Sequence, residues 1–101
     1  MAEYRILLHP AALIEIQSLE GRVCAVVAKQ IAKLAKYPFL GDPLGNKHGY
    51  DLTGYRKMYA DRKRIRIVYS IVEDMVLVKI IAIGRRADNE VYRDADARTE
   101  W

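Results

Sequence analysis

The sequence has very little cysteine, because Cys24 is the only one among its 101 residues. An internal disulfide is therefore impossible, and a reducing compartment is the natural setting. Cys24 lies in an apolar helical stretch, where a small buried thiol is more common than a nucleophile. The chain also lacks an apolar run long enough for a membrane span, and its N-terminus lacks a secretion-signal pattern. We therefore expect a cytoplasmic protein with no membrane partner.

The sequence also lacks the motifs of several enzyme classes. It has no glycine-rich loop that would cradle a phosphate and no Ser, His and Asp in the order of a hydrolase triad. Neither His9 nor His48 has a partner at the spacing of a metal site. These absences argue against nucleotide-driven chemistry and against metal hydrolysis. We expect no cofactor and no bound metal.

What the chain does contain is an ordinary globular composition with a basic excess. Apolar residues make up 51% and charged residues 30%, and the formal net charge is +4. A chain of this length suffices for one domain, residues 1–101, with a core of its own. The positive charge favours an anionic partner but does not identify one.

The first half of the chain predicts a strand and two helices. A β-prone run covers residues 4–8, and Pro10 suits the first position of the helix that follows. Gly21 is expected to end that helix. Apolar residues from Val23 to Leu34 then recur at helical spacing, and the second helix ends at Tyr37 and Pro38. The two helices should form an antiparallel hairpin.

The second half predicts a loop and three strands. Glycine and proline crowd residues 38–54, which indicates a loop. The predicted strands are residues 55–60, 64–72 and 75–83, with a tight turn at Glu73 and Asp74. The third strand is apolar on both faces apart from Lys79, as is typical of a central strand. The polar residues 87–101 predict a short or weakly held helix.

Together these elements predict an α+β fold. The order is β-α-α-β-β-β with a short C-terminal segment, and the helical hairpin packs on one mostly antiparallel sheet.

Two arginines and a tyrosine near the C-terminus are the most informative residues. Strand alternation puts Arg64 and Arg66 on the face opposite Ile65 and its apolar neighbours, which predicts that both project from an open face of the sheet. Arg85 and Arg86 end the next strand just after Gly84, so one of them can reach the same surface. Guanidinium groups pair with phosphate oxygens and a phenol can move a proton, so this combination suits a phosphodiester.

Each of these residues also has a purely structural interpretation. The cations between positions 56 and 66 could simply protect a strand edge from aggregation, since Asp61 is the single acid among them. Those cations are Arg56, Lys57, Arg62, Lys63, Arg64 and Arg66. Tyr92 could simply pack, because a free phenol titrates near pH 10 and needs neighbouring cations to act as a base.

Six short segments, taken in order and spacing, resemble one known family. They read His-Pro-Ala (9–11), Tyr-Pro-Phe (37–39), Gly-Tyr-Arg (54–56), Arg-Ile-Arg-Ile-Val-Tyr (64–69), Ile-Ala-Ile-Gly-Arg-Arg (81–86) and Glu-Val-Tyr (90–92). The chain resembles the RelE/ParE superfamily of bacterial type II toxins over nearly its whole length. The resemblance implies a RelE-like (microbial RNase-like) fold and a cognate antitoxin partner.

The resemblance also implies one of two targets. RelE-type members enter the ribosomal A site and cut mRNA without a metal, by attack of the ribose 2′-oxygen. ParE-type members poison DNA gyrase and generally lack the arginine and tyrosine set. The toxin–antitoxin complex is further expected to bind operator DNA.

The resemblance assigns roles residue by residue. Arg66 matches the arginine that steadies the scissile phosphate, and Arg86 the one proposed to protonate the leaving group or stabilise transition-state charge. Tyr92 matches a proposed general base or orienting phenol, and Arg56 a supporting lysine. The expected RNA-binding residues are Lys47, Lys57, Arg62, Lys63, Arg64 and Arg85, and His48 could contribute from the same loop as Lys47.

The chain departs from the RelE pattern at Met58, where those enzymes usually carry a second lysine. The turn around residues 61–63 is also one residue longer than the family pattern. The departure could mean slower cleavage, replacement by Lys57 or Arg64 through a shifted register, or no cleavage. Three hypotheses follow: a ribosome-dependent endonuclease, a ParE-like gyrase inhibitor, and a catalytically weak relative that mainly binds its antitoxin.

Overall fold

The computed structural model describes residues 3–87, 90–99 and 101. Its elements are β1 (Arg5–Leu8), α1 (Pro10–Gln17), α2 (Gly21–Lys33), β2 (Asp42–Pro43), β3 (Asn46–Lys47), β4 (Tyr50–Asp51), β5 (Tyr55–Ala60), β6 (Ile65–Val72), β7 (Leu77–Arg85) and α3 (Glu90–Ala97). The predicted order of strands and helices is confirmed. The loop over residues 38–54 additionally contains three two-residue strands.

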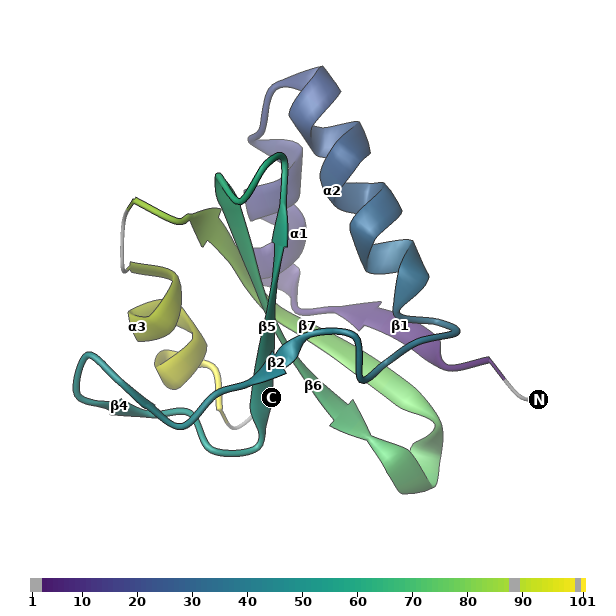
Figure 1. The fold of residues 1–101 in the computed structure, drawn as a ribbon, viewed down its shortest axis with the longest axis vertical. Coiled ribbons are helices and arrows are strands. Elements are labelled where there is room, and N and C mark those ends of the chain that lie inside the picture. The colour runs from purple at the N-terminus through teal and green to yellow at the C-terminus, as the bar shows by residue number, and fades with distance from the viewer. Residues whose placement is uncertain (1–2, 88–89, 100) are drawn as a thin grey trace.

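Five strands form one mixed sheet in the order β1-β7-β6-β5-β2. Strand β1 pairs with β7 in parallel, and the other three pairs are antiparallel. Strand β7 lies between β1 and β6, so the prediction of a central third strand is confirmed. Helices α1 and α2 lie on one side of this sheet and α3 lies on the other (Figure 1).

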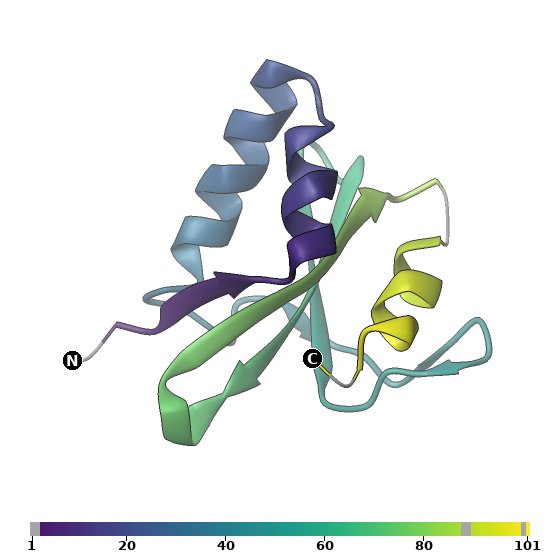
Figure 2. The ribbon, with the colours of Figure 1, turned by 180° about the vertical axis from the view of Figure 1, so that it is seen from behind.

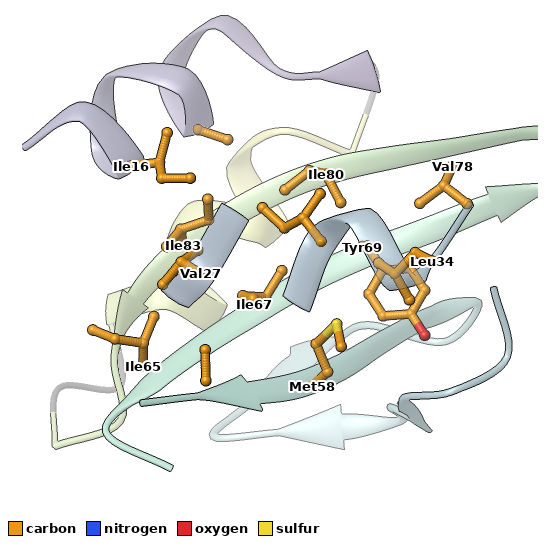
Figure 3. Packing of buried hydrophobic residues seen from close by; sticks show 13 residues of the cluster. Ile16, Val27, Leu34, Met58, Ile65, Ile67, Tyr69, Val78, Ile80 and Ile83 are labelled. Atoms are coloured by element: carbon orange, nitrogen blue, oxygen red, sulfur yellow. The ribbon is translucent and has the colours of Figure 1, made fainter. Parts of the chain in front are cut away.

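The larger hydrophobic core fills the space between the helical hairpin and the sheet (Figure 3). Val27 and Ile31 on α2 and its C-cap residue Leu34 recur at helical spacing, so all three turn toward the sheet, where they meet Ile67 and other strand side chains. Burying each such aliphatic side chain contributes about 1.5–3 kcal/mol. Because this core occupies the face of β5 and β6 toward the helical hairpin, the opposite face is available for other contacts.

The sequence predicted the start of α1 correctly but not its end. Pro10 does begin α1, and His9 caps it, since His9 Nδ1 accepts a hydrogen bond from the Ala11 N–H at 3.0 Å. The prediction that Gly21 ends α1 is wrong: the helix stops at Gln17, and the Ser18 hydroxyl donates to the Ile14 carbonyl oxygen at 2.8 Å. Gly21 is instead the first residue of α2.

The turn between β6 and β7 also differs from its prediction. A short 3₁₀ turn covers Glu73–Met75, and Val76 then adopts a left-handed conformation with φ of 50°. Strand β7 therefore begins at Leu77 and not at Met75. The turn is wider than the two-residue hairpin expected at Glu73 and Asp74.

The second face of the sheet is not open, which corrects the prediction for Arg66. Arg64 is exposed as predicted, but it lies in the turn before β6 and not on the strand. Helix α3 packs across it and buries Val91, Tyr92 and Ala95 against strand residues of β6 and β7. Figure 2 shows α3 beside the end of β7, next to the β3–β4 hairpin. The C-terminal segment is thus a packed element, because its apolar residues at positions 91, 92 and 95 share one helical face. Among the described residues, no helix has the length and apolar character needed to cross a bilayer.

Candidate active site

Strand register brings Tyr59, Arg66 and Arg86 to the same face of the sheet. Tyr59 pairs with Arg66 across β5 and β6, and Arg66 pairs with Gly84 across β6 and β7. Arg86 follows Gly84 by two residues, and its N–H donates to the Arg64 carbonyl oxygen at 2.8 Å. Because alternate residues of a strand share a face, Arg86 lies on the side of Tyr59 and Arg66.

Arg66 is a buried cation with unused hydrogen-bonding capacity. Its exposed fraction is 7%, and within the described part of the chain its Nε and Nη1 atoms have no hydrogen-bond partner. Its guanidinium carbon lies 4.6 Å from the centroid of the Tyr92 ring and 5.7 Å from that of Tyr59. Buried donors without partners are rare and costly, whereas an anion between them would satisfy both. Arg66 is therefore the candidate anion-binding residue of this site.

Tyr92 is a buried residue that supports Arg66. Its ring is 2% exposed, and His48 stacks on it with 5.8 Å between ring centroids. The approach of α3 depends on Gly84, since a Cβ there would lie 3.1 Å from the Val91 Cβ. A side chain at this position would push away the helix that carries Tyr92.

Tyr59 is a phenol surrounded by cations. The Lys57 Nζ lies 3.0 Å from the Tyr59 hydroxyl oxygen and 5.0 Å from the ring centroid. The Arg86 guanidinium and the Lys63 ammonium lie 5.6 Å and 6.0 Å from the same centroid. The hydrogen bond from Lys57 is the main cause that lowers the pKa of Tyr59 to about 8; burial opposes it, and the positive charge of Arg66 adds to it.

Sequence reasoning did not select Tyr59. The signal was its position two residues after Lys57 on the same strand, but its use required the pairing of Tyr59 with Arg66 across the hairpin.

Arg56 lies apart from this group. Its Nε donates to the Gly41 carbonyl oxygen at 3.0 Å, and its guanidinium lies 5.3 Å from the Phe39 ring centroid. Met58 is buried in the core beneath the helical hairpin. Strand alternation therefore places positions 56 and 58 on one side of β5 and positions 57 and 59 on the other. Of the alternatives for the missing lysine, the geometry favours Lys57 through a shifted register.

The turn between β5 and β6 presents more cations. Asp61, Arg62 and Lys63 have φ values of 51°, 56° and 66°, a left-handed run that costs non-glycine residues about 1 kcal/mol or more each. The Asp61 carboxylate lies 3.2 Å from Arg22 and 3.9 Å from Arg64, and these ion pairs help to hold the turn.

Four of the six expected RNA-binding residues share one groove. A cavity of about 640 Å³ between this turn, the start of α2 and the end of β7 is lined by six cations and by two acids, Glu20 and Asp61. These cations are Arg22, Arg62, Lys63, Arg64, Arg85 and Arg86. Lys57 lies at the Tyr59 phenol instead, and Lys47 lies in β3, in the hairpin whose His48 stacks on Tyr92.

The site contains no ready-made cluster for a metal. Over residues 3–87, 90–99 and 101, no three His, Cys, Asp or Glu side chains gather at ligand distance. The chemistry that the residues themselves offer is anion binding by guanidinium groups and proton transfer by a phenol.

Comparisons with known proteins find relatives in sequence and in structure. No family model matches the chain. A curated Escherichia coli protein named for its likeness to the RelE toxin is 24% identical over 98 residues, which cover 94% of this chain and 96% of the relative.

Solved structures share the fold over almost the full chain. A doubly substituted variant of the Escherichia coli toxin RelE in the free state superposes with a TM-score of 0.76 at 23% identity, covering 97% of this chain and 98% of that one. The toxin–antitoxin complex RelBE2 of Mycobacterium tuberculosis gives 0.70 at 27% identity, covering 87% and 97%. The predicted resemblance to the RelE/ParE superfamily and the RelE-like α+β fold are confirmed.

Proposed function

We propose that this chain, which has a RelE-like sequence and fold, is the toxin of a type II toxin–antitoxin pair and cuts mRNA on the ribosome. The observation that carries the proposal is the buried guanidinium of Arg66, which has donors without partners in the described structure and lies near the Tyr59 ring, as does the guanidinium of Arg86. A scissile phosphate is an anion that would satisfy those donors. Endonuclease chemistry requires cations at such a phosphate.

The reaction that fits these groups is transesterification of RNA. The ribose 2′-oxygen attacks the adjacent phosphorus, and the 5′-oxygen of the next nucleotide departs. Arg66 would hold the phosphate, and Arg86 would stabilise the charge that develops in the transition state; both guanidinium groups stay protonated. Tyr92 would keep Arg66 in place, the orienting role among its two expected roles.

Such a small set of groups needs help in positioning its substrate. Holding the 2′-oxygen in line with the departing oxygen can supply much of the acceleration. The ribosome holds its message in a defined path, so dependence on the ribosome follows from the sparseness of the site. The basic groove around the β5–β6 turn would bind the flanking RNA backbone.

The proposed partner is an acidic antitoxin. Solved relatives include RelE proteins with RelB antitoxins from Mycobacterium tuberculosis and Pyrococcus horikoshii. A partner of this chain would cover cationic and apolar surface, which suits an acidic segment that folds on binding. The complex would in turn bind operator DNA.

The experiment that tests this function maps mRNA 5′ ends in a translating bacterial extract, with and without the purified protein. We expect new ends at codons occupied by ribosomes and none in the same RNA without ribosomes. Intact messages together with gyrase-dependent DNA damage would instead select the ParE-like alternative. Intact messages with no toxicity would leave only antitoxin binding.

A further inference from the structure

The structure contains two phenols near Arg66, and they differ in their access to a substrate. Tyr92 is buried between His48 and Arg66, with 2% of its surface exposed. Tyr59 is half-buried, so more of its surface is accessible than that of Tyr92. A phosphate bound by Arg66 would therefore meet Tyr59, which pairs with Arg66 across β5 and β6, more readily than Tyr92.

We propose that the hydroxyl oxygen of Tyr59, as a phenolate, takes the proton from the attacking 2′-hydroxyl; this inference rests on the proposed nuclease function. Three observations of geometry support it. Tyr59 pairs directly with Arg66, its hydroxyl is held by the Lys57 ammonium at 3.0 Å, and the Arg86 guanidinium lies over its ring. A base must lie within reach of both the nucleophile and the phosphate. Among the described tyrosines, Tyr59 is the one whose ring lies near the guanidinium groups of both Arg66 and Arg86.

The charges around Tyr59 favour its ionised form. Lys57, Lys63, Arg66 and Arg86 all lie within 6.0 Å of its ring centroid. Further charged residues line a cavity between β5 and α2 that Tyr59 also borders, and these are Arg22, Lys29, Lys33, Asp61 and Arg62. Asp61 is the single acid among them, and it is paired with Arg22 and Arg64. With a pKa of about 8, roughly one phenol in ten is ionised at pH 7, compared with about one in a thousand for a free tyrosine.

The step balances without a metal or a cofactor. The Tyr59 phenolate takes the 2′-hydroxyl proton, the 2′-oxygen bonds to phosphorus, and the bond from phosphorus to the 5′-oxygen breaks. The departing oxygen takes a proton from a solvent water, and the hydroxide that remains takes the proton back from Tyr59. The products are a 2′,3′-cyclic phosphate and a 5′-hydroxyl end.

The test compares Tyr59→Phe with the matched control Tyr55→Phe in single-turnover cleavage of a message on purified ribosomes, over a range of pH. Tyr55 lies on the same strand and its hydroxyl contacts the Thr99 carbonyl oxygen at 3.5 Å, so its loss removes a phenol away from Arg66. Both variants keep the aromatic ring. Melting temperature and binding to the programmed ribosome are measured for each, so that a folding or binding defect is recognised.

We expect the wild-type rate to rise with pH and to level near pH 8. Tyr59→Phe should lower the rate about 100-fold or more and abolish the levelling of the rate near pH 8, with ribosome binding unchanged. Tyr55→Phe should cleave at the wild-type rate. The near-ultraviolet absorbance of free wild-type protein should also show one tyrosine titrating near pH 8 that Tyr59→Phe lacks.

The outcomes distinguish a failure of the Tyr59 proposal from a failure of the nuclease function. If the wild type cleaves and Tyr59→Phe cleaves equally fast with the same pH profile, Tyr59 is not the base and the nuclease function stands. If the wild type does not cleave on the ribosome, both proposals are overturned.

Discussion

The guanidinium carbon of Arg66 lies 4.6 Å from the centroid of the Tyr92 ring, and both side chains are buried. In the proposed mechanism Tyr92 supports Arg66 through this contact, and Tyr59 transfers the proton. We therefore expect Tyr92→Phe, which keeps the ring, to lower single-turnover cleavage by roughly tenfold or less, well below the loss in Tyr59→Phe. Tyr92→Ala should instead destabilise the fold by about 3–5 kcal/mol. A larger kinetic loss in Tyr92→Phe than in Tyr59→Phe would reverse the two roles.

Two arginines of this chain provide a paired test of the anion site. Arg98 makes a bidentate ion pair with Glu15 at 2.9 Å and 3.0 Å and donates to the Ile81 carbonyl oxygen, whereas Arg66 has buried donors without partners in the described structure. Arg98→Met should therefore destabilise the protein by about 2–3 kcal/mol. Arg66→Met should leave stability unchanged or raise it by about 1 kcal/mol while removing cleavage.

Denaturant unfolding of both variants measures this difference. If Arg66→Met is as unstable as Arg98→Met, Arg66 is a structural residue and its donors are not kept free for a ligand.

Lys57 should set the pH dependence of the site. Its hydrogen bond is the largest cause of the lowered pKa of Tyr59. Lys57→Met should return that pKa toward 10, so the pH at which cleavage levels moves upward and activity at neutral pH falls. The absorbance titration of tyrosine follows the same shift in the free protein. An unchanged titration in Lys57→Met would show that Lys57 does not hold the phenolate.

The lowered pKa of Tyr59 also raises the free energy of unfolding at alkaline pH. Between about pH 8 and pH 10 the unfolded chain retains the Tyr59 proton and the folded chain does not. Stability from this group is therefore present above the unfolded value and is lost as the pH falls through about 8.

His9 should make the first helix sensitive to acid. Its neutral Nδ1 caps α1, and burial is the main cause that lowers the pKa of His9; Arg98 adds to this effect and Glu15 opposes it. The cap is intact above the unfolded value of about 6.5 and is lost as the pH falls through the lower folded value. His9→Asn keeps a capping acceptor that does not titrate, so its stability should fall less between pH 7 and pH 5. The expected difference is about 1 kcal/mol, measured by thermal unfolding at each pH. Equal acid sensitivity in the two proteins would exclude His9 as its source.

The sequence predicted most of the fold because its signals are local. Pro10 and the apolar spacing of Val27, Ile31 and Leu34 act within one element, so the helices and their inner face follow directly. The end of α1 was missed because the closing contact is made by Ser18, while Gly21 carries the stronger stop signal.

The site was predicted less completely because it depends on contacts between distant segments. Arg66 and Arg86 were chosen for their chemistry, but the burial of Arg66 follows from α3, which approaches through the space left at Gly84. Tyr59 enters the site only through its register with Arg66, and a one-residue shift would turn it into the core. Arg56 was chosen by alignment to a pattern, and strand alternation places it on the other side of β5.

The most direct test of the account is single-turnover cleavage of a message on purified ribosomes by Arg86→Ala, with Arg93→Ala as the control. Arg93 lies exposed on α3 and pairs with Asp94, so both variants lose one surface charge. The account predicts that Arg86→Ala loses at least about 100-fold in rate with its fold intact, while Arg93→Ala cleaves at the wild-type rate. Equal rates in the two variants would contradict it, because Arg86 would then have no part in stabilising the transition state.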